Sequence, residues 1–518
     1  MEREKGRETT TCLGLFLVVL ALYALFSPGR IDIIDGQIRF EVARNLIEMG
    51  EPILRDPAIM FMALPGRNGA AVSHYGLGPS VGSVPVLWLW KIVDGSSLEF
   101  GRFLFSLTSS LYGAGLAVVV YLSYRRLGIT RISALGWTAV CATATLLWPL
   151  SATTFDQAQH AFLFGLCFFL VAFSGPSAGA GRGMAAGLSA GFLCAHHEYL
   201  FLLAFPLAFL PVFVRADRAL SGARFRIGLL TGLLAGVIVM LALNWWRFGS
   251  PLESGQALRS RIFGYSLLGN PLSGLAVLLA SPGKGVVFFS PVCLLSALGF
   301  SGLKRQAPEV ARAVAVATVI LFGFLSFVSF RGGDWCWGPR YLAPLLPLWA
   351  LSLPFSPRKI RGLPVRNVFV GAGLVVQLLA LSVDHQRFFF ERALPDYFWA
   401  WDPGFYFRDS ALFSRPGELM SLPRGAPAEA RLFRPGPEPT SVTYCIFGNL
   451  DRRDAPRWMR EFRVFYLPRP WPLWMVTIEE SRRPIALIPW IAGLMAVACT
   501  GAALLVTSLR RPSPDQVP

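Results

Sequence analysis

Apolar residues fill the chain in repeated blocks of about 17 to 25 residues, separated by short polar and basic segments. A helix needs roughly 20 consecutive apolar residues to cross about 30 Å of hydrocarbon. Inside lipid, a helix also satisfies its own backbone hydrogen bonds. The pattern therefore predicts an all-α polytopic membrane protein.

The composition agrees with this pattern. Of the 518 residues, 54% are hydrophobic and only 15% are charged, and the mean hydropathy is +0.51. A typical soluble domain carries more charge and fewer apolar residues. The first apolar run, residues 11–27, is followed by SPGRIDIID, which offers no small-x-small cleavage site. We therefore expect an uncleaved first span rather than a secretory signal.

Basic clusters orient the predicted spans, because Lys and Arg collect in the cytoplasmic loops of membrane proteins. The clusters are residues 3–7, 125–131, 182, 215–226, 303–312, 357–366 and 510–511. With these inside, both termini are cytoplasmic and twelve spans are predicted: 11–27, 102–124, 132–149, 157–174, 183–195, 199–214, 226–246, 286–303, 313–330, 341–355, 367–384 and 485–508. Residues 75–93 are expected to form a juxtamembrane or re-entrant helix, because a span there would turn residues 125–131 outward.

Two predicted outer segments are long, residues 28–101 in the first loop and residues 385–484 before the last span. The chain accordingly divides into a transmembrane module (1–384), an extracytoplasmic segment or small domain (385–484), and a last span with a cytoplasmic tail (485–518). The net charge of +17 resides mainly in the cytoplasmic loops. We therefore expect membrane lipids, and no nucleic acid, as partners.

Titratable side chains gather on the predicted outer face. All five histidines fall there: His74, His160, His196, His197 and His385. Asp156 precedes His160 by four residues and so shares a helix face with it. A charge at membrane depth costs about 2.5–3.5 kcal/mol, so such groups pair or line a wet cavity. We therefore predict one polar cavity that opens outward.

The segment GGDWCWGPRY, residues 332–341, joins two apolar runs and is predicted to form part of the cavity wall. Glycine-rich, non-helical backbone is tolerated at this depth where it lines a cavity. Two pairs of interpretations stay open. Asp334 and Arg340 either form an ion pair that holds the turn or contact a substrate. Trp337 is either an interfacial belt residue or a ligand contact.

An acidic residue begins the first outer loop. Asp35 lies at the predicted membrane edge and is followed by an amphipathic helix that stops at Gly50. The apolar face of that helix is Phe40, Ala43, Leu46 and Ile47. This stretch resembles the outer loop of GT-C glycosyltransferases, such as the protein O-mannosyltransferases and the bacterial aminoarabinose transferase. In that family an acid after the first span precedes an A-x-x-L-x-x-x-G helix.

Further segments extend the resemblance to about residue 355. HYGLGPSVGSVPVLW, residues 74–88, is similar to the family's Y/H-P-P-x-x-x-x-x-P stretch. RFGSPLESG, SPGKGVVFFSP and GGDWCWGPRYLAPLLP resemble strings shared by many bacterial members. The chain departs from the family where GLGPS replaces the paired prolines. It departs again where His196, His197 and Glu198 stand near the fifth span in place of a basic residue.

The resemblance implies a GT-C-type bundle of about twelve transmembrane helices that acts as an inverting glycosyltransferase on the outer face of the cytoplasmic membrane. Its donor would be a sugar on a polyprenyl phosphate, and its acceptor a hydroxyl of a glycan, lipid or protein, without a cofactor or a metal. Asp35 would be the general base and Asp156 a second catalytic acid, since a hydroxyl is a weak nucleophile until a carboxylate takes its proton. The leaving lipid phosphate needs cations. The expected substrate-binding residues are Asp32, His74, Tyr75, His160, His196, His197, Lys284, Asp334, Trp337, Arg340 and Tyr341.

Several alternatives remain open from the sequence. Asp32 competes with Asp35 for the role of base, and Asp35 has a structural interpretation as a helix cap. His160 taken alone is typical of a satisfied interior histidine. The main rival function is a transporter or flippase for a lipid-linked precursor, although no repeat of two related halves is found. A third candidate function is a scaffold for envelope assembly without catalytic activity.

Overall fold

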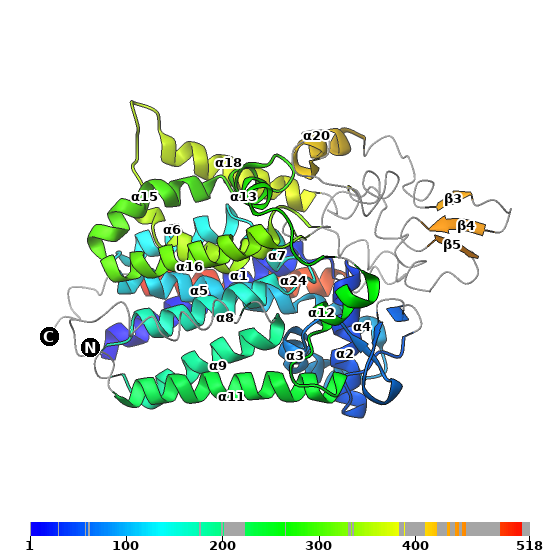
Figure 1. The fold of residues 1–518 in the computed structure, drawn as a ribbon. Coiled ribbons are helices and arrows are strands. Elements are labelled where there is room, and N and C mark those ends of the chain that lie inside the picture. The colour runs from blue at the N-terminus through cyan, green and yellow to red at the C-terminus, as the bar shows by residue number, and fades with distance from the viewer. Residues whose placement is uncertain are drawn as a thin grey trace.

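We describe a computed structural model of the chain (Figure 1). It describes residues 2–509, except residues 30, 57–58, 61–62, 176–177, 198–199, 201–222, 265, 330–332, 334–335, 383–387, 389–409, 422–432, 436–440, 445–447 and 452–486.

Most of the described chain is helical, which confirms the predicted all-α class. The longer helices are α1 (Glu2–Phe26), α2 (Ile34–Met49), α3 (Gly78–Asp94), α5 (Thr108–Arg126), α6 (Arg131–Thr143), α8 (Gln157–Ala172), α9 (Ala180–His196), α11 (Ala223–Phe248), α15 (Val292–Gln306), α16 (Pro308–Phe327), α18 (Val365–Ser382) and α24 (Leu487–Leu509). The shorter helices are α4 (Leu98–Ser106), α7 (Leu147–Ser151), α12 (Gly255–Phe263), α13 (Pro271–Ala280), α14 (Val286–Phe289), α17 (Leu346–Ala350) and α20 (Ala411–Ser421).

Strands and 3-10 turns make up little of the described chain. An antiparallel hairpin pairs β1 (Ala63–Pro65) with β2 (Ala71–Ser73), with Leu64 opposite Val72. The sheet β3 (Phe433–Pro435), β4 (Ser441–Tyr444) and β5 (Gly448–Asp451) is antiparallel throughout. The 3-10 helices are η2 (Arg67–Gly69), η4 (Arg340–Leu345) and η5 (Leu353–Phe355).

Six helical stretches in the described residues are long and apolar enough to cross a membrane: Glu4–Phe26, Phe100–Arg126, Ala223–Phe248, Pro308–Phe327, Val365–Ser382 and Pro489–Leu509. They coincide with six of the twelve predicted spans. The outward surface of α11 is strongly apolar, with Ile227, Leu234 and Ile238 all more than half exposed. Water would not tolerate so large an apolar surface, but lipid does. The chain is therefore a multi-pass membrane protein.

Three predicted spans are wrong as continuous helices. The span 132–149 is divided between α6 and α7, and the span 286–303 between α14 and α15. The span 341–355 is the most broken. Residues 341–355 form the series η4, α17 and η5 instead of one helix. Pro344, Pro347 and Pro354 recur through this stretch, and each lacks the N–H that an uninterrupted helix would use. The broken segment is nevertheless buried, with Leu342 and Leu345 fully inside the core. The predicted span 199–214 lies almost entirely outside the described residues.

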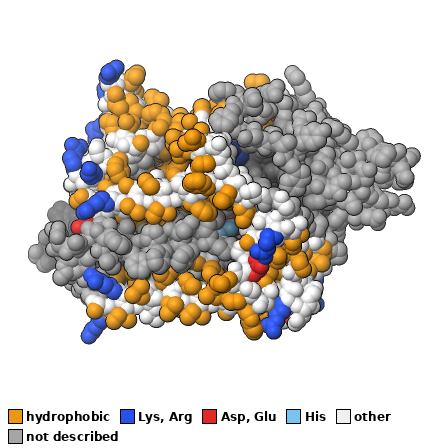
Figure 2. Space-filling view, viewed as in Figure 1, with side chains coloured by type: hydrophobic (Ala, Val, Ile, Leu, Met, Phe, Trp, Pro, Cys, Tyr) orange, Lys and Arg blue, Asp and Glu red, His pale blue; other side chains and the backbone are white. Residues whose placement is uncertain are grey.

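The long helices lie side by side in one bundle (Figure 1). Lys and Arg gather at the end where α1 begins, on the termini of α5, α6, α9 and α15, and Figure 2 shows them on that side. We call this the basic end. It is the end that the sequence predicts to be cytoplasmic. The candidate residues lie at the opposite end, which we call the site end.

Helices of the first loop form a small unit at the site end. Phe40 and Ala43 of α2 pack with Leu87 and Trp90 of α3 and with Phe105 of α4. This confirms the predicted amphipathic helix, and Gly50 ends it in the left-handed conformation, with φ 72°. Residues 75–93, predicted to form a juxtamembrane or re-entrant helix, do contain a helix, α3.

Candidate functional site

Two antiparallel helices bring several candidate residues together. Helices α8 and α9 pack along each other, so the first turn of α8 meets the last turn of α9 at the site end. Asp156 immediately precedes α8 and His160 lies in its first turn, whereas His196 and His197 end α9. The His160 ring centroid lies 5.1 Å from that of His196 and 5.2 Å from that of His197.

Asp35, in the first turn of α2, has its carboxylate in a dense set of contacts. The Tyr75 hydroxyl donates to Asp35 Oδ1 at 2.5 Å. Arg340 Nη1 lies 3.4 Å from Asp35 Oδ2, and Arg39 Nη2 lies 3.8 Å from it. These contacts tie the carboxylate to side chains rather than to the helix end.

Charge and burial act in opposite directions on Asp35. Burial by itself raises the pKa of this carboxyl, but the guanidinium groups of Arg340 and Arg39 and the Tyr75 hydrogen bond lower the pKa below the ordinary 3.8. Burial and the adjacent Asp35 charge raise the pKa of Tyr75 well above 10. Asp35 is therefore ionised at neutral pH, and Tyr75 is a neutral donor to it.

Asp156 forms the second acidic centre of the site. Its Oδ2 atom lies 3.1 Å from Arg39 Nη2, 3.4 Å from His160 Nε2 and 3.5 Å from His197 Nε2. Gln157 Nε2 donates to the other oxygen, Oδ1, at 2.7 Å. The carboxylate is therefore fixed on one side and crowded by nitrogen atoms on the other.

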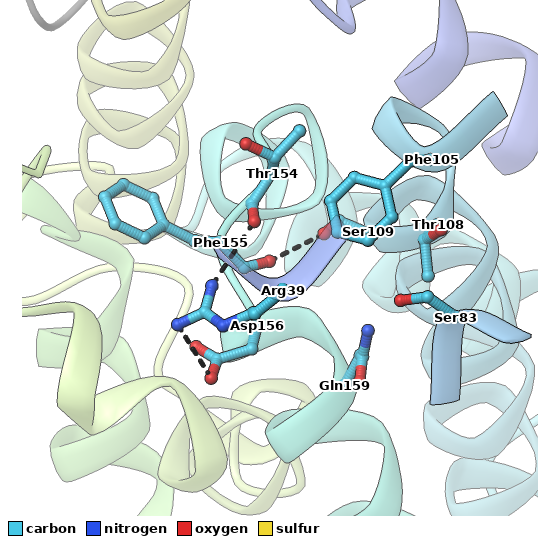
Figure 3. A pocket seen from close by; sticks show the side chains of 9 residues that line it. All are labelled: Arg39, Ser83, Phe105, Thr108, Ser109, Thr154, Phe155, Asp156 and Gln159. Atoms are coloured by element: carbon cyan, nitrogen blue, oxygen red, sulfur yellow. Dashed lines mark hydrogen bonds and ion pairs between the residues drawn. The ribbon is translucent and has the colours of Figure 1, made fainter. Parts of the chain in front are cut away.

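Arg39 links the two acids. Figure 3 shows its guanidinium group beside the Asp156 carboxylate and the Thr154 carbonyl oxygen, to which Nη1 donates at 3.4 Å. Sequence reasoning missed this residue. The signal was present, because Arg39 follows Asp35 by four residues and so shares its helix face.

A small cavity borders this pair. Its volume is about 10 Å³, which is room for about one water molecule. It is lined by Arg39, Ser83, Phe105, Thr108, Ser109, Thr154, Phe155, Asp156 and Gln159 (Figure 3). A sugar does not fit in this space, so in this conformation the cavity holds at most solvent.

Asp32 holds the loop that carries Asp156. Its Oδ1 accepts a hydrogen bond from the Thr154 backbone N–H at 2.9 Å and a second from the Thr154 hydroxyl group. The carboxylate of Asp32 thus fixes the segment between α7 and α8 against the start of the first outer loop. The Asp35 carboxylate, in contrast, contacts the side chains of Tyr75, Arg340 and Arg39.

The turn before η4 presents Arg340. Gly333 and Gly338 both have positive φ, at 74° and 68°. A Cβ on Gly333 would lie 2.5 Å from Arg340 Cγ, so this position needs glycine both for its backbone and for the space. The guanidinium carbon of Arg340 lies 4.2 Å from the Phe155 ring centroid, and Nη2 lies 3.5 Å from the Tyr341 hydroxyl oxygen. This segment was predicted to form part of a cavity wall; its Arg340 contacts Asp35, but none of its described residues lines the small cavity beside Asp156.

Lys284 and Trp337 lie behind the same turn. Lys284 Nζ donates to the Cys336 carbonyl oxygen at 2.6 Å and lies 3.4 Å from Cys336 Sγ. Cys336 in turn packs with Ile33 and Phe155, next to the Asp35 helix. Trp337 is only 3% exposed and meets Phe289 edge to face, so the belt interpretation is wrong for this tryptophan.

The other two described histidines have specific partners. His196 is bonded at both ring nitrogens, to the Phe192 carbonyl oxygen at 2.9 Å and to Gln159 Oε1 at 3.0 Å. It is the satisfied interior histidine that we expected at His160. The His74 ring packs at a tilt against Tyr75, with 3.9 Å between ring centroids, and its Nε2 lies 3.0 Å from Arg259 Nη1. Arg259 was not foreseen. Asp334, Glu198 and His385 lie outside the described residues.

In chemical terms, the site is an ionised carboxylate with a hydroxyl donor and two arginines, beside a second carboxylate with two imidazoles. It can accept a proton and can hold an anion. Comparison with known proteins adds no relative: no family model matches the chain, and no curated protein matches it.

Proposed function

We propose that this protein is an integral-membrane glycosyltransferase that moves a sugar from a polyprenyl-phosphate donor to an acceptor hydroxyl by an inverting, general-base mechanism. The proposal rests on one observation above the others. Asp35 is an ionised, buried carboxylate held by Arg39 of its own helix and by Tyr75 and Arg340 of two distant segments.

Asp35 is the base in this proposal, and Asp32 is not. Asp32 is committed to Thr154 through two hydrogen bonds, whereas Asp35 Oδ1 accepts a single side-chain hydroxyl. An acceptor hydroxyl that took the place of the Tyr75 hydroxyl would lie within hydrogen-bond reach of the carboxylate. Asp156 would hold Arg39 in position between the acids.

The lipid-phosphate leaving group would meet the cations of the turn before η4. Arg340 offers planar donors that match phosphate oxygens, and Lys284 lies against the same turn as a point charge. The two cations would stabilise the charge that develops on the departing phosphate. We further propose that the site end faces outward from the cytoplasmic membrane, since the basic end matches the positive-inside rule, and that the bundle crosses twelve times.

Mass analysis of a deletion strain tests the proposal. Polyprenyl-phosphate sugars and envelope glycans would be measured in the deletion strain and in strains that carry the wild-type or the Asp35→Asn gene. A transferase predicts accumulated lipid-linked sugar and an under-decorated glycan in the deletion and Asp35→Asn strains. Unchanged pools of both in the deletion strain would contradict it. A flippase instead predicts a donor that accumulates on the cytoplasmic leaflet, out of reach of an impermeant oxidant added to intact cells.

A further inference from the structure

The cluster of Asp156, His160 and His197 has the composition of a metal site. Each residue offers one ligand atom, and these three atoms lie within 4.8 Å of one another. The residues come from the start of α8 and the end of α9 and are 2%, 1% and 7% exposed, respectively. No metal was predicted from the sequence, because the resemblance implied an enzyme that works without one.

Two of the ligand atoms are buried without a hydrogen bond. Asp156 Oδ2 and His160 Nε2 are both enclosed, and none of their contacts has hydrogen-bond geometry. Three nitrogen atoms lie around the one oxygen, at 3.1, 3.4 and 3.5 Å, and make ionic contacts with it. A buried polar atom without a hydrogen bond is costly, and such atoms commonly indicate a ligand that completes the site.

The spacing of these atoms fits a tetrahedral ion. Zinc bonds to His nitrogen and carboxylate oxygen of about 2.0–2.2 Å give ligand atoms roughly 3.3–3.5 Å apart. The Asp156 Oδ2 to His160 Nε2 and Asp156 Oδ2 to His197 Nε2 distances are 3.4 and 3.5 Å. Two edges of the tetrahedron are therefore already in place.

From these observations we propose that Asp156, His160 and His197 bind one divalent transition-metal ion of the zinc class. Imidazole ligands suit Zn²⁺ and Co²⁺, whereas Mg²⁺ prefers an all-oxygen shell. Gln157 orients the carboxylate through Asp156 Oδ1, as an outer-shell partner does at metal sites. Arg39 contacts Asp35 as well as Asp156, so an ion bound to Asp156 would replace only one of its two ion pairs.

The small cavity borders one of the three proposed ligands, Asp156. Asp156, Arg39 and Gln159 line this cavity, which has room for about one water molecule. Zinc sites with three protein ligands keep a fourth position for water or a substrate oxygen. Metal binding does not depend on the proposed transferase activity, so the two proposals can fail separately.

Cobalt titration of the full-length protein tests the site. The protein would be purified in detergent through a tag without histidine, stripped with a chelator, and titrated with Co²⁺. We expect one Co²⁺ per chain with the intense visible bands of a tetrahedral ion, displaced by equimolar Zn²⁺ and unaffected by a large excess of Mg²⁺. Asp156→Asn, His160→Gln and His197→Gln should each weaken binding by at least about tenfold.

His196→Gln is the matched control, because His196 is equally buried and adjacent but is bonded to Phe192 and Gln159. It should bind Co²⁺ like the wild type. In case a ligand variant fails to fold, His160→Cys keeps a ligand atom and should add a thiolate-to-cobalt absorption band. No stoichiometric ion in the folded wild type, full affinity in the three ligand variants, or equal loss in His196→Gln would each overturn the proposal.

Discussion

At the scale of single residues, the site is a set of compensating buried charges. Asp35 and Asp156 face Arg340 and Arg39, and all four side chains are nearly enclosed. An isolated buried ion is costly, and a partner offsets that cost. Removing one member of the set therefore leaves an uncompensated charge.

Arg340→Gln should destabilise the protein strongly. Breaking a buried ion pair by removing one partner costs about 3–5 kcal/mol. The matched control is Arg261→Gln, because Arg261 pairs with Glu253 but is 60% exposed and contributes at most about 1 kcal/mol. Thermal unfolding in detergent measures both. Equal melting temperatures for the two variants would show that Arg340 does not compensate a buried charge.

The response to acid should follow from the lowered pKa of Asp35. A carboxyl with a depressed folded-state pKa stabilises the protein fully above its unfolded pKa of about 3.9, and this contribution is lost as the pH falls through the folded value. Asp35 faces Arg340, Arg39, Tyr75 and His74. The contribution of Asp35 to the free energy of unfolding should therefore stay constant from neutral pH down to about pH 5.

Loss of Arg340 should move that acid limit to higher pH. Without Arg340, Arg39 and Tyr75 alone offset the effect of burial, so the pKa of Asp35 in the folded protein rises. Melting temperatures of the wild type and Arg340→Gln, recorded over about pH 3 to pH 7, measure the shift. Identical pH profiles for the two proteins would mean that Arg340 does not set the pKa of Asp35.

At the scale of elements, α9 and α11 position two of the histidines. Glycines on the two helices face each other, and a Cβ on Gly187 would lie 2.1 Å from the Leu229 carbonyl oxygen. Small residues let membrane helices approach this closely. Since α9 ends at His196, its contact with α11 fixes where His196 and His197 lie.

Gly187→Ala should therefore force α9 and α11 apart. We expect a lower melting temperature and, with it, weaker Co²⁺ binding at Asp156, His160 and His197. Gly323→Ala in α16 is the control, since a Cβ there meets no atom within 4 Å and alanine favours a helix by about 1 kcal/mol. A Gly187→Ala protein as stable as Gly323→Ala would show that α9 and α11 can accommodate a methyl group at their contact.

Patterns along single elements could be predicted, and contacts between elements could not. The Gly50 stop and the apolar face of α2 follow from local propensity and were correct. The three prolines of residues 341–355 argue against a continuous helix, but the prediction gave more weight to the number of apolar residues. Arg39 shares a helix face with Asp35, which the sequence does show, but its contact with Asp156 arises only from the fold. The satisfied histidine was assigned to His160 instead of His196 because the sequence does not show where Gln159 points.

At the scale of the whole molecule, charge separates the two ends of the bundle. The basic end carries the exposed Lys359, and the site end carries Leu252, which is 85% exposed after α11. In the topology that we propose, the positive-inside rule places the basic end in the cytoplasm. In our account the site end, which lies opposite the basic end, therefore faces outward.

Cysteine labelling of intact cells measures this orientation. A membrane-impermeant maleimide should modify Leu252→Cys in intact cells, and Lys359→Cys only after lysis. The wild type, with its own cysteines, supplies the background. Labelling of Lys359→Cys in intact cells, with Leu252→Cys protected, would reverse the topology and remove the outward-facing site.

The central claim is that the Asp35 carboxylate activates an acceptor hydroxyl. On the proposed function, membranes of the deletion strain retain both donor and acceptor, so purified protein can be added to them and sugar transfer followed by mass spectrometry. Folded Asp35→Asn should be slower than the wild type by about 10²- to 10⁴-fold, whereas Glu51→Gln, an exposed acid of the same loop, should transfer at the wild-type rate. Transfer by folded Asp35→Asn at the wild-type rate would contradict the account.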